Sequence, residues 1–139
     1  MEITYYTIEE KHYEELVELW ESIPGVKVRK DDDKEGFLRL LHRNIGCSFL
    51  AMEGGIIVGS ILCGIDGKRA YIYHMAVKEK YRDQKIGTNL VGMVQKKAKE
   101  FGVSKCSFVA FKENHIGEQF WKSLGAVKRT DLDYYDLEV

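Results

Sequence analysis

The stretch Tyr81-Arg82-Asp83-Gln84-Lys85-Ile86-Gly87-Thr88 lies between two segments of different periodicity. Before it, residues 70–77 (AYIYHMAV) are rich in aromatic and β-branched residues, which predicts a buried strand. After it, apolar residues recur at helical spacing from Leu90 to Phe101, which predicts an amphipathic helix. A polar turn with two basic side chains and a glycine therefore joins the end of a strand to the start of a helix.

Such a turn is suited to binding an anion. The first N–H groups of a helix have no partner inside the helix, and the helix dipole favours negative charge at that end. Gly87 allows a phosphate to approach the main chain closely. Residues 78–105 carry eight Lys or Arg against three Asp or Glu, so the local charge agrees. The turn predicts a phosphate site, although junctions of this kind also occur without any ligand.

Two well-known phosphate motifs are absent from the sequence. It contains no G-x-x-x-x-G-K-[ST], and no G-x-G-x-x-G follows a predicted strand. A P-loop NTPase and a Rossmann dehydrogenase are therefore both disfavoured.

Residues 74–91 (HMAVKEKYRDQKIGTNLV) resemble motif A of the GNAT N-acetyltransferase superfamily, R/Q-x-x-G-x-G/A. Arg82 matches its first position and Gly87 its last, while Lys85 replaces its first glycine. Residues 113–127 (ENHIGEQFWKSLGAV) resemble motif B of the same family, in which an asparagine begins a helix that ends in a leucine-glycine pair. Two motifs in the right order and spacing are far more specific than either alone.

The resemblance implies acetyl-CoA as co-substrate and no metal. In GNAT proteins motif A grips the pyrophosphate, and the preceding strand hydrogen-bonds the pantetheine arm where two parallel strands splay apart. Carried over to this sequence, the implied cofactor-binding residues are Met75, Ala76, Val77, Arg82, Asp83, Gln84, Lys85, Ile86, Gly87, Thr88, Asn114, Gly117, Phe120 and Trp121. A lysine at position 85 is unsuited only if the backbone there requires a positive φ.

The resemblance also implies direct acetyl transfer to an amine without an acyl-enzyme. His74 lies just before the cofactor contacts and is a candidate base, but strand alternation also allows it to pack on the other face of the sheet. Tyr73 is a second candidate, since several GNAT proteins carry an acceptor-side carboxylate there. Trp121 stands where many members have a tyrosine that protonates the leaving thiolate, and an indole N–H has no useful acidity.

The order of elements predicts an α/β GNAT fold in a single domain over residues 1–139. We expect a mixed, twisted sheet of six to seven strands, flanked by about four helices, with splayed central parallel strands. Asp31, Asp32 and Asp33 can cap the second helix, and Asn114 the last one. The expected strands are residues 3–8, 48–52, 56–65, 70–77, 105–111, 126–129 and 134–139.

Composition places few further limits on function. The net charge of −1 gives no reason to expect nucleic acid, and no apolar run approaches the roughly 18 residues of a membrane span. Three widely spaced cysteines, Cys47, Cys63 and Cys106, indicate reduced thiols in a cytoplasmic protein. His12, His42 and His115 have no companions at metal-ligand spacing. The acceptor is either a small-molecule or a peptide amine, a homodimer stays open, and a CoA-binding sensor without catalysis is the alternative from another class.

Overall fold

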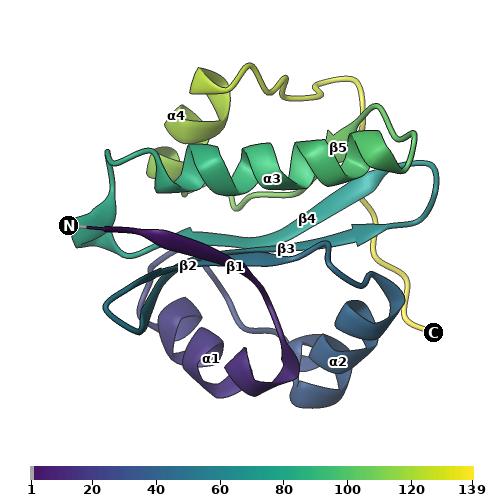
Figure 1. Ribbon diagram of the computed structural model, residues 1–139. Helices are drawn as coiled ribbons and strands as arrows, with labels where there is room; N and C mark the ends of the chain where they lie inside the picture. The colour runs from purple at the N-terminus through teal and green to yellow at the C-terminus, as the bar shows by residue number, and fades with distance from the viewer. Residues whose placement is uncertain (1) are drawn as a thin grey trace. The chain divides into compact units, whose positions relative to one another are not determined.

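The computed structural model describes residues 2–139. Its internal contacts divide the chain into two compact units, the first ending at Val109 and the second spanning Ala110–Val139. In the first unit a twisted sheet lies between a layer of two helices and a single long helix (Figure 1). The second unit contains one helix and the C-terminal segment.

The sheet has five strands in the order β1-β2-β3-β4-β5 among the described residues. Neighbours pair antiparallel except β4 and β5, which are parallel, so the predicted mixed α/β sheet is confirmed. The number of strands was predicted as six to seven, and that is wrong. The strands are β1 (Thr4–Thr7), β2 (Phe49–Glu53), β3 (Ile56–Ile65), β4 (Ala70–Val77) and β5 (Cys106–Ser107).

The error lies at the C-terminal end of the chain. Residues 126–129 and 134–139 contain no strand, and the predicted strand 105–111 is reduced to two residues. A strand exists only where its backbone pairs with a neighbour. Among residues 126–139, one backbone hydrogen bond forms: the Ala126 N–H donates to the carbonyl of Trp121 and closes the preceding helix. Apolar alternation identified segments suited to a sheet, but it does not show whether a strand edge is free to pair with them.

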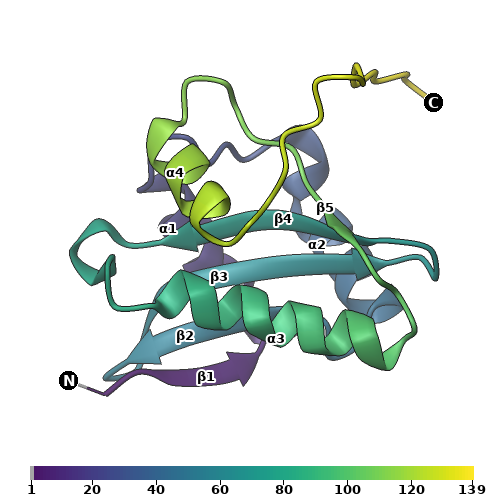
Figure 2. The same cartoon turned by 90° about the horizontal axis from the view of Figure 1, so that it is seen from above.

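Two helices cover one face of the sheet and one covers the other (Figure 1, Figure 2). On the first face, α1 (Tyr13–Glu21) and α2 (Lys34–Arg43) bury a core that includes Leu16, Trp20 and Leu62. On the other, α3 (Ile86–Glu100) buries Ile86, Leu90 and Val94. The close approach of α3 depends on Gly59 in β3, where a Cβ would lie 3.1 Å from Ile86. With α4 (His115–Ser123) in the second unit, the described residues form the four helices that were predicted.

Short 3-10 turns precede three of these elements: η1 (Glu10–His12), η2 (Lys30–Asp32) and η3 (Glu79–Tyr81). Asp33 follows η2 and caps α2, accepting the Gly36 N–H at 2.8 Å. Gly36 is needed there because a Cβ would lie 2.0 Å from the carbonyl oxygen of Asp31. The turn and the helix start are therefore built as one piece.

Strand β4 is irregular at its centre. Leu62 pairs with Tyr73 and Ser60 with Ala76, so His74 and Met75 together oppose the single residue Ile61. His74 has a φ of 44°, unusual for a residue with a side chain. These features define a β-bulge, which bends the strand and redirects its side chains.

Candidate active site

The turn that leads into α3 offers unpaired backbone donors. The first hydrogen bond of the helix joins the Asn89 N–H to the carbonyl of Lys85 at 2.9 Å. The N–H groups of Ile86, Gly87 and Thr88 come before it and have no partner among residues 2–139. Such groups, together with the helix dipole, favour an anion at this point.

Two residues of this turn have left-handed backbone conformations, Asp83 with φ 64° and Lys85 with φ 63°. Lys85 is the N-cap of α3 and stands where motif A has a glycine. The sequence reasoning treated a positive φ here as incompatible with lysine, and that condition was too strict. A non-glycine residue in this region costs about 1–2 kcal/mol, which a buried helix start such as Ile86 can offset.

The end of β4 has an unpaired edge next to this turn in the sequence. Its parallel partner β5 pairs only with Ala70 and Tyr71. Farther along, the Lys78 N–H donates to Val58 in β3, and Ala76 pairs with Ser60. Because successive backbone groups of a strand point to opposite sides, the Val77 N–H faces the edge where β5 has already ended. A splay of the two parallel strands was expected, and their residue pairing ends at Tyr71.

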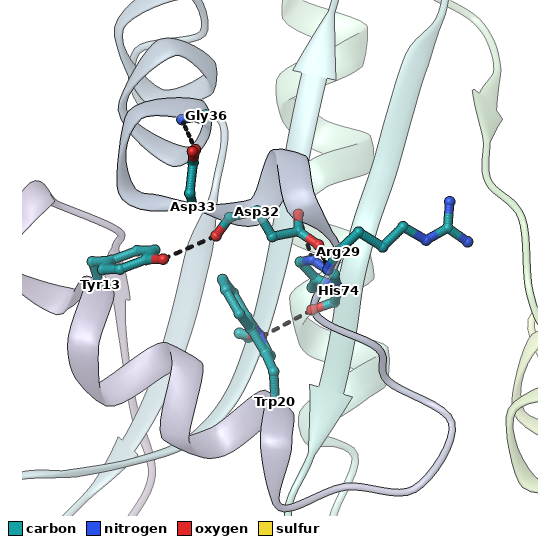
Figure 3. A network of polar contacts seen from close by, with 8 residues as sticks. Tyr13, Trp20, Arg29, Asp32, Asp33, Gly36 and His74 are labelled. Carbon is teal, nitrogen blue, oxygen red and sulfur yellow. Dashed lines mark hydrogen bonds and ion pairs between the residues drawn. The ribbon is translucent and has the colours of Figure 1, made fainter. Parts of the chain in front are cut away.

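His74 lies on the α1 face of the sheet. Its ring centroid is 4.5 Å from that of Trp20 in α1, and Nε2 is 2.9 Å from Oδ1 of Asp32 in η2 (Figure 3). The sequence reasoning left open, from strand alternation, that His74 packs on the other face of the sheet. The bulge breaks that alternation, so Tyr73 and His74 both lie toward the α1–α2 layer.

The polar contacts around His74 come from distant parts of the chain. Trp20 Nε1 donates to Ser60 Oγ at 2.9 Å, and Ser60 Oγ donates to the carbonyl of His74, also at 2.9 Å. Asp32 accepts the Arg29 N–H at 2.7 Å through Oδ2. Burial alone would raise the pKa of Asp32, but His74 and the Arg29 N–H outweigh it and lower that pKa. The carboxylate is therefore held in its charged form.

Tyr73 lies on the same face, beside α2. Its ring is within 4.9 Å of the Tyr71 ring, and a Cβ at Gly64 would lie 4.0 Å from it. The side chain is 44% exposed, so it borders the α2 side of the sheet as a partly open aromatic wall.

The sequence model of the Acetyltransferase (GNAT) family matches residues 9–126. The chain belongs to the GNAT acetyltransferase family. Solved structures with the same fold cover nearly the whole chain. One is a GNAT acetyltransferase from Staphylococcus aureus Mu50, 25% identical, with a TM-score of 0.79 over 99% of this chain and 95% of that one.

Two further structures with the GNAT fold were solved in complex with a ligand. The PaiA N-acetyltransferase of Thermoplasma acidophilum, in complex with coenzyme A, is 21% identical, with a TM-score of 0.81 over 96% of this chain and 94% of that one. The enzyme AAC(6')-Iy, in complex with the bisubstrate analog CoA-S-monomethyl-acetylneamine, is 16% identical, with a TM-score of 0.77 over 100% of both chains. At these identities the likeness establishes the shared GNAT fold.

The remaining GNAT motif residues lie in the second unit. Asn114 caps α4 as predicted, accepting the Gly117 N–H at 3.0 Å. A Cβ on Gly117 would lie 2.6 Å from the Asn114 amide, so the glycine keeps this cap in place. Phe120 and Trp121 follow in the same helix, with ring centroids 5.0 Å apart and ring planes inclined at 67°. Motif B thus has its expected local structure within its own unit.

Other types of site have little support among residues 2–139. Among residues 2–139, no three His, Cys, Asp or Glu side chains gather as a metal site would require. In the same part of the chain, no helix is both long enough and apolar enough to cross a membrane. Cys47, Cys63 and Cys106 are unpaired cysteines, and burial is the main cause that raises the pKa of Cys63 to about 12.

Sequence reasoning missed Asp32 as a partner of His74. The run Asp31-Asp32-Asp33 was interpreted only as a helix cap, and Asp33 alone performs that task. The sequence did contain a signal, since a helix cap needs one carboxylate and this run has three. Nothing local linked Asp32 to a histidine 42 residues farther along.

Proposed function

We propose that this GNAT protein, acting as a single domain over residues 1–139, is an acetyl-CoA-dependent N-acetyltransferase. It transfers an acetyl group directly to a primary amine of an acceptor that is not yet identified. The observation that carries the proposal is the unpaired edge of β4 at Val77, followed nine to eleven residues later by the unpaired N–H groups that open α3. The edge of β4 suits the amide groups of the pantetheine arm of CoA, and the N–H groups of α3 suit its phosphates.

The fit of these groups to CoA supports the assignment of co-substrate. The turn contains Arg82 and Lys85 together with three unpaired N–H groups. It therefore offers an anion the fixed dipoles of the backbone and the positive charges of two flexible side chains. The backbone of Met75, Ala76 and Val77 would hold the pantetheine arm, and Arg82 to Thr88 the pyrophosphate. We also assign Asn114, Gly117, Phe120 and Trp121 to the cofactor side, through motif B of the family.

The reaction joins two bound reactants and needs little covalent work. The amine loses a proton, its nitrogen bonds to the thioester carbonyl carbon, and the C–S bond then breaks to release CoA thiolate. The amine gives up two protons overall when it arrives charged, one to a base and one to the thiolate or solvent. Holding both reactants in line supplies roughly 7–11 kcal/mol in favourable cases.

His74 is the base that we favour in this mechanism. It lies at the bulge of β4, one residue before the proposed pantetheine contacts, and its ring is held by Trp20 and Asp32. Tyr73 is the alternative on the same strand. Protonation of the thiolate is not assigned to Trp121, since a thiol with a pKa of about 8.5 leaves readily near neutral pH.

The acceptor is proposed to be a small amine. In support, AAC(6')-Iy shares the GNAT fold over its full length and is described with an aminoglycoside-derived bisubstrate analog. An amino group of a protein or peptide remains the second candidate. Cytoplasmic location and a homodimer remain predictions.

The alternative from another class is a CoA-binding sensor without catalysis, which the indole at position 121 favours. The two are separated by calorimetric titration with acetyl-CoA together with thiol release across a panel of amines and lysine peptides. Binding with acceptor-dependent thiol release supports the transferase. Binding without turnover over the whole panel identifies the sensor, and no binding contradicts both.

A further inference from the structure

Asp32 faces His74 with one carboxylate oxygen and its own backbone with the other. Oδ1 lies 2.9 Å from His74 Nε2, and Oδ2 accepts the Arg29 N–H at 2.7 Å. The two side chains are 19% and 12% exposed, so the pair is largely shielded from water. The Nε2–Oδ1 contact has an ion-pair distance but is not aligned as a full hydrogen bond. Because Nε2 is buried without another partner, the carboxylate is the acceptor available to it.

The backbone around Asp32 is anchored independently of His74. Tyr13 in α1 donates its hydroxyl to the Asp32 carbonyl at 2.9 Å. On the other side, Asp33 caps α2, and Gly36 lets the helix start fit against Asp31. The carboxylate is thus held in place by α1 and α2 rather than drawn to the histidine by a flexible loop.

The imidazole is anchored from its own side as well. The bulge gives His74 a φ of 44°, and its carbonyl accepts from Ser60 Oγ, which in turn accepts from Trp20 Nε1. The Trp20 ring also packs against the imidazole at 4.5 Å between centroids. Asp32 and His74 are therefore each held in place by contacts other than the one between them.

This arrangement selects a tautomer of the imidazole. An ionised carboxylate can only accept hydrogen bonds, so the nitrogen that faces it must carry the proton. With Nε2 protonated, a neutral imidazole has its lone pair on Nδ1. No hydrogen bond to Nδ1 is found among residues 2–139, and Nε2 is the ring nitrogen that is buried without a hydrogen-bond partner. Nδ1 is therefore not fully buried, and its lone pair can face a substrate.

We propose that Asp32 is a positioning residue that holds His74 as the Nε2–H tautomer, with Nδ1 as the proton acceptor for the incoming amine. The inference rests on the proposed function for its chemistry, while the tautomer itself is a property of the protein without substrates. In the reaction, the ammonium form of the acceptor passes one proton to Nδ1. Asp32 keeps its charge and balances the imidazolium that forms.

The direct test measures the imidazole nitrogens by long-range ¹H–¹⁵N NMR on histidine-labelled protein, above the pH at which the rings titrate. His74 is assigned by comparison with His74→Gln. His12 serves as an internal reference, since its Nδ1 accepts the Glu9 N–H at 2.9 Å and its proton must lie on Nε2. We expect the wild-type His74 to match the His12 pattern. A wild-type His74 with its proton on Nδ1 would overturn the proposal without any variant.

The matched pair of variants is Asp32→Asn and Asp31→Asn, which remove the same charge from neighbouring positions of η2. An asparagine at position 32 can donate to Nε2 and so favours the Nδ1–H tautomer. We expect that switch in Asp32→Asn and an unchanged His74 signal in Asp31→Asn. A His74 tautomer that is the same in all three folded proteins would contradict the proposal.

The kinetic arm uses an acceptor from the amine panel. We expect kcat to fall about 10²-fold or more in Asp32→Asn, with KM for acetyl-CoA unchanged and Asp31→Asn within twofold of wild type. Equal kcat in both variants would contradict the positioning role. If no amine is acetylated, the proposed function fails, while the NMR result still decides the tautomer.

Discussion

Two regions of the first unit can be compared: the turn of residues 82–88 and the side-chain cluster of Trp20, Asp32, Ser60 and His74. The turn takes its groups from seven consecutive residues and offers mainly backbone N–H groups. The cluster takes one side chain each from α1, η2, β3 and β4, and Figure 3 shows Trp20, Asp32 and His74 close together. The turn is determined by neighbouring residues in the sequence, whereas the cluster exists only after folding.

The difference explains how each region responds to substitution. A backbone donor survives most side-chain changes, provided that the helix still starts at the same residue. The cluster has no such redundancy, because each of its contacts depends on particular side-chain atoms at a defined distance. We therefore expect large, position-specific losses in the cluster and moderate losses in the turn.

The largest expected effect is on turnover in His74→Ala. Removing the base should lower kcat by about 10² or more and flatten the rise of rate with pH. That rise is expected because an alkyl ammonium with a pKa of about 10.4 must lose its proton. Steady-state kinetics from pH 6 to 9 measure both. A normal profile in His74→Ala together with loss in Tyr73→Phe would move the base to Tyr73.

Asp32→Asn should come next, measured as stability. The Asp32 carboxylate accepts a hydrogen bond from the Arg29 N–H and lies at ion-pair distance from His74. A hydrogen bond to a charged group is worth about 1.5–3 kcal/mol, so we expect a loss of about 2 kcal/mol at neutral pH. The pKa of Asp32 is lowered in the folded state, so its contribution is present above the usual value of 3.8 and is lost as pH falls through the lower folded pKa. Urea unfolding at pH 7 and pH 3 should show the gap to wild type closing. A gap that stays constant with pH would contradict the charged pair.

The turn is tested by removing one backbone donor. Thr88 is exposed and lies in the first turn of α3, where a proline is tolerated. Thr88→Pro should weaken acetyl-CoA binding about tenfold, or about 1.4 kcal/mol, because it deletes one N–H. Thr88→Ala keeps that N–H and should bind within twofold of wild type in calorimetry. Equal affinity in both folded variants would remove the Thr88 N–H from the site.

The smallest effect is expected from Lys85→Gly, which restores the glycine of motif A. Relief of the left-handed backbone should raise the free energy of unfolding by about 1 kcal/mol. Gln84 does not have a positive φ, so Gln84→Gly should destabilise instead. Thermal unfolding of both variants measures the difference. Destabilisation by both would mean that Lys85 contributes contacts that outweigh its strain.

The comparison also explains what the sequence could predict. Periodicity and turn residues predicted four of the strands, all four helices, a cap within Asp31–Asp33 and the cap at Asn114, because each signal lies within a few neighbouring residues. The closing strands at 126–129 and 134–139 failed because pairing depends on a distant edge. The partner of His74 was beyond reach for the same reason, whereas the left-handed backbone of Lys85 was raised from the sequence only as a condition. The roles of the site residues still await the experiments above.

The bulge in β4 shifts the alternation of side chains between the two faces of the sheet by one residue. Tyr73 and Ala76 are three residues apart, an odd number, yet both lie toward the α1–α2 layer because they pair with Leu62 and Ser60. Deleting one residue at position 74 would make the spacing of Tyr73 and Ala76 even, like that of Leu62 and Ser60, so the bulge would close while both residues kept their face. The single residue left opposite Ile61 would then point to the α3 face. The extra residue of the bulge is therefore what allows His74 to share a face with Tyr73 and Ala76, beside Asp32. Chain length at this point is constrained as strictly as residue identity, and relatives of this protein that keep this histidine should also keep the extra residue.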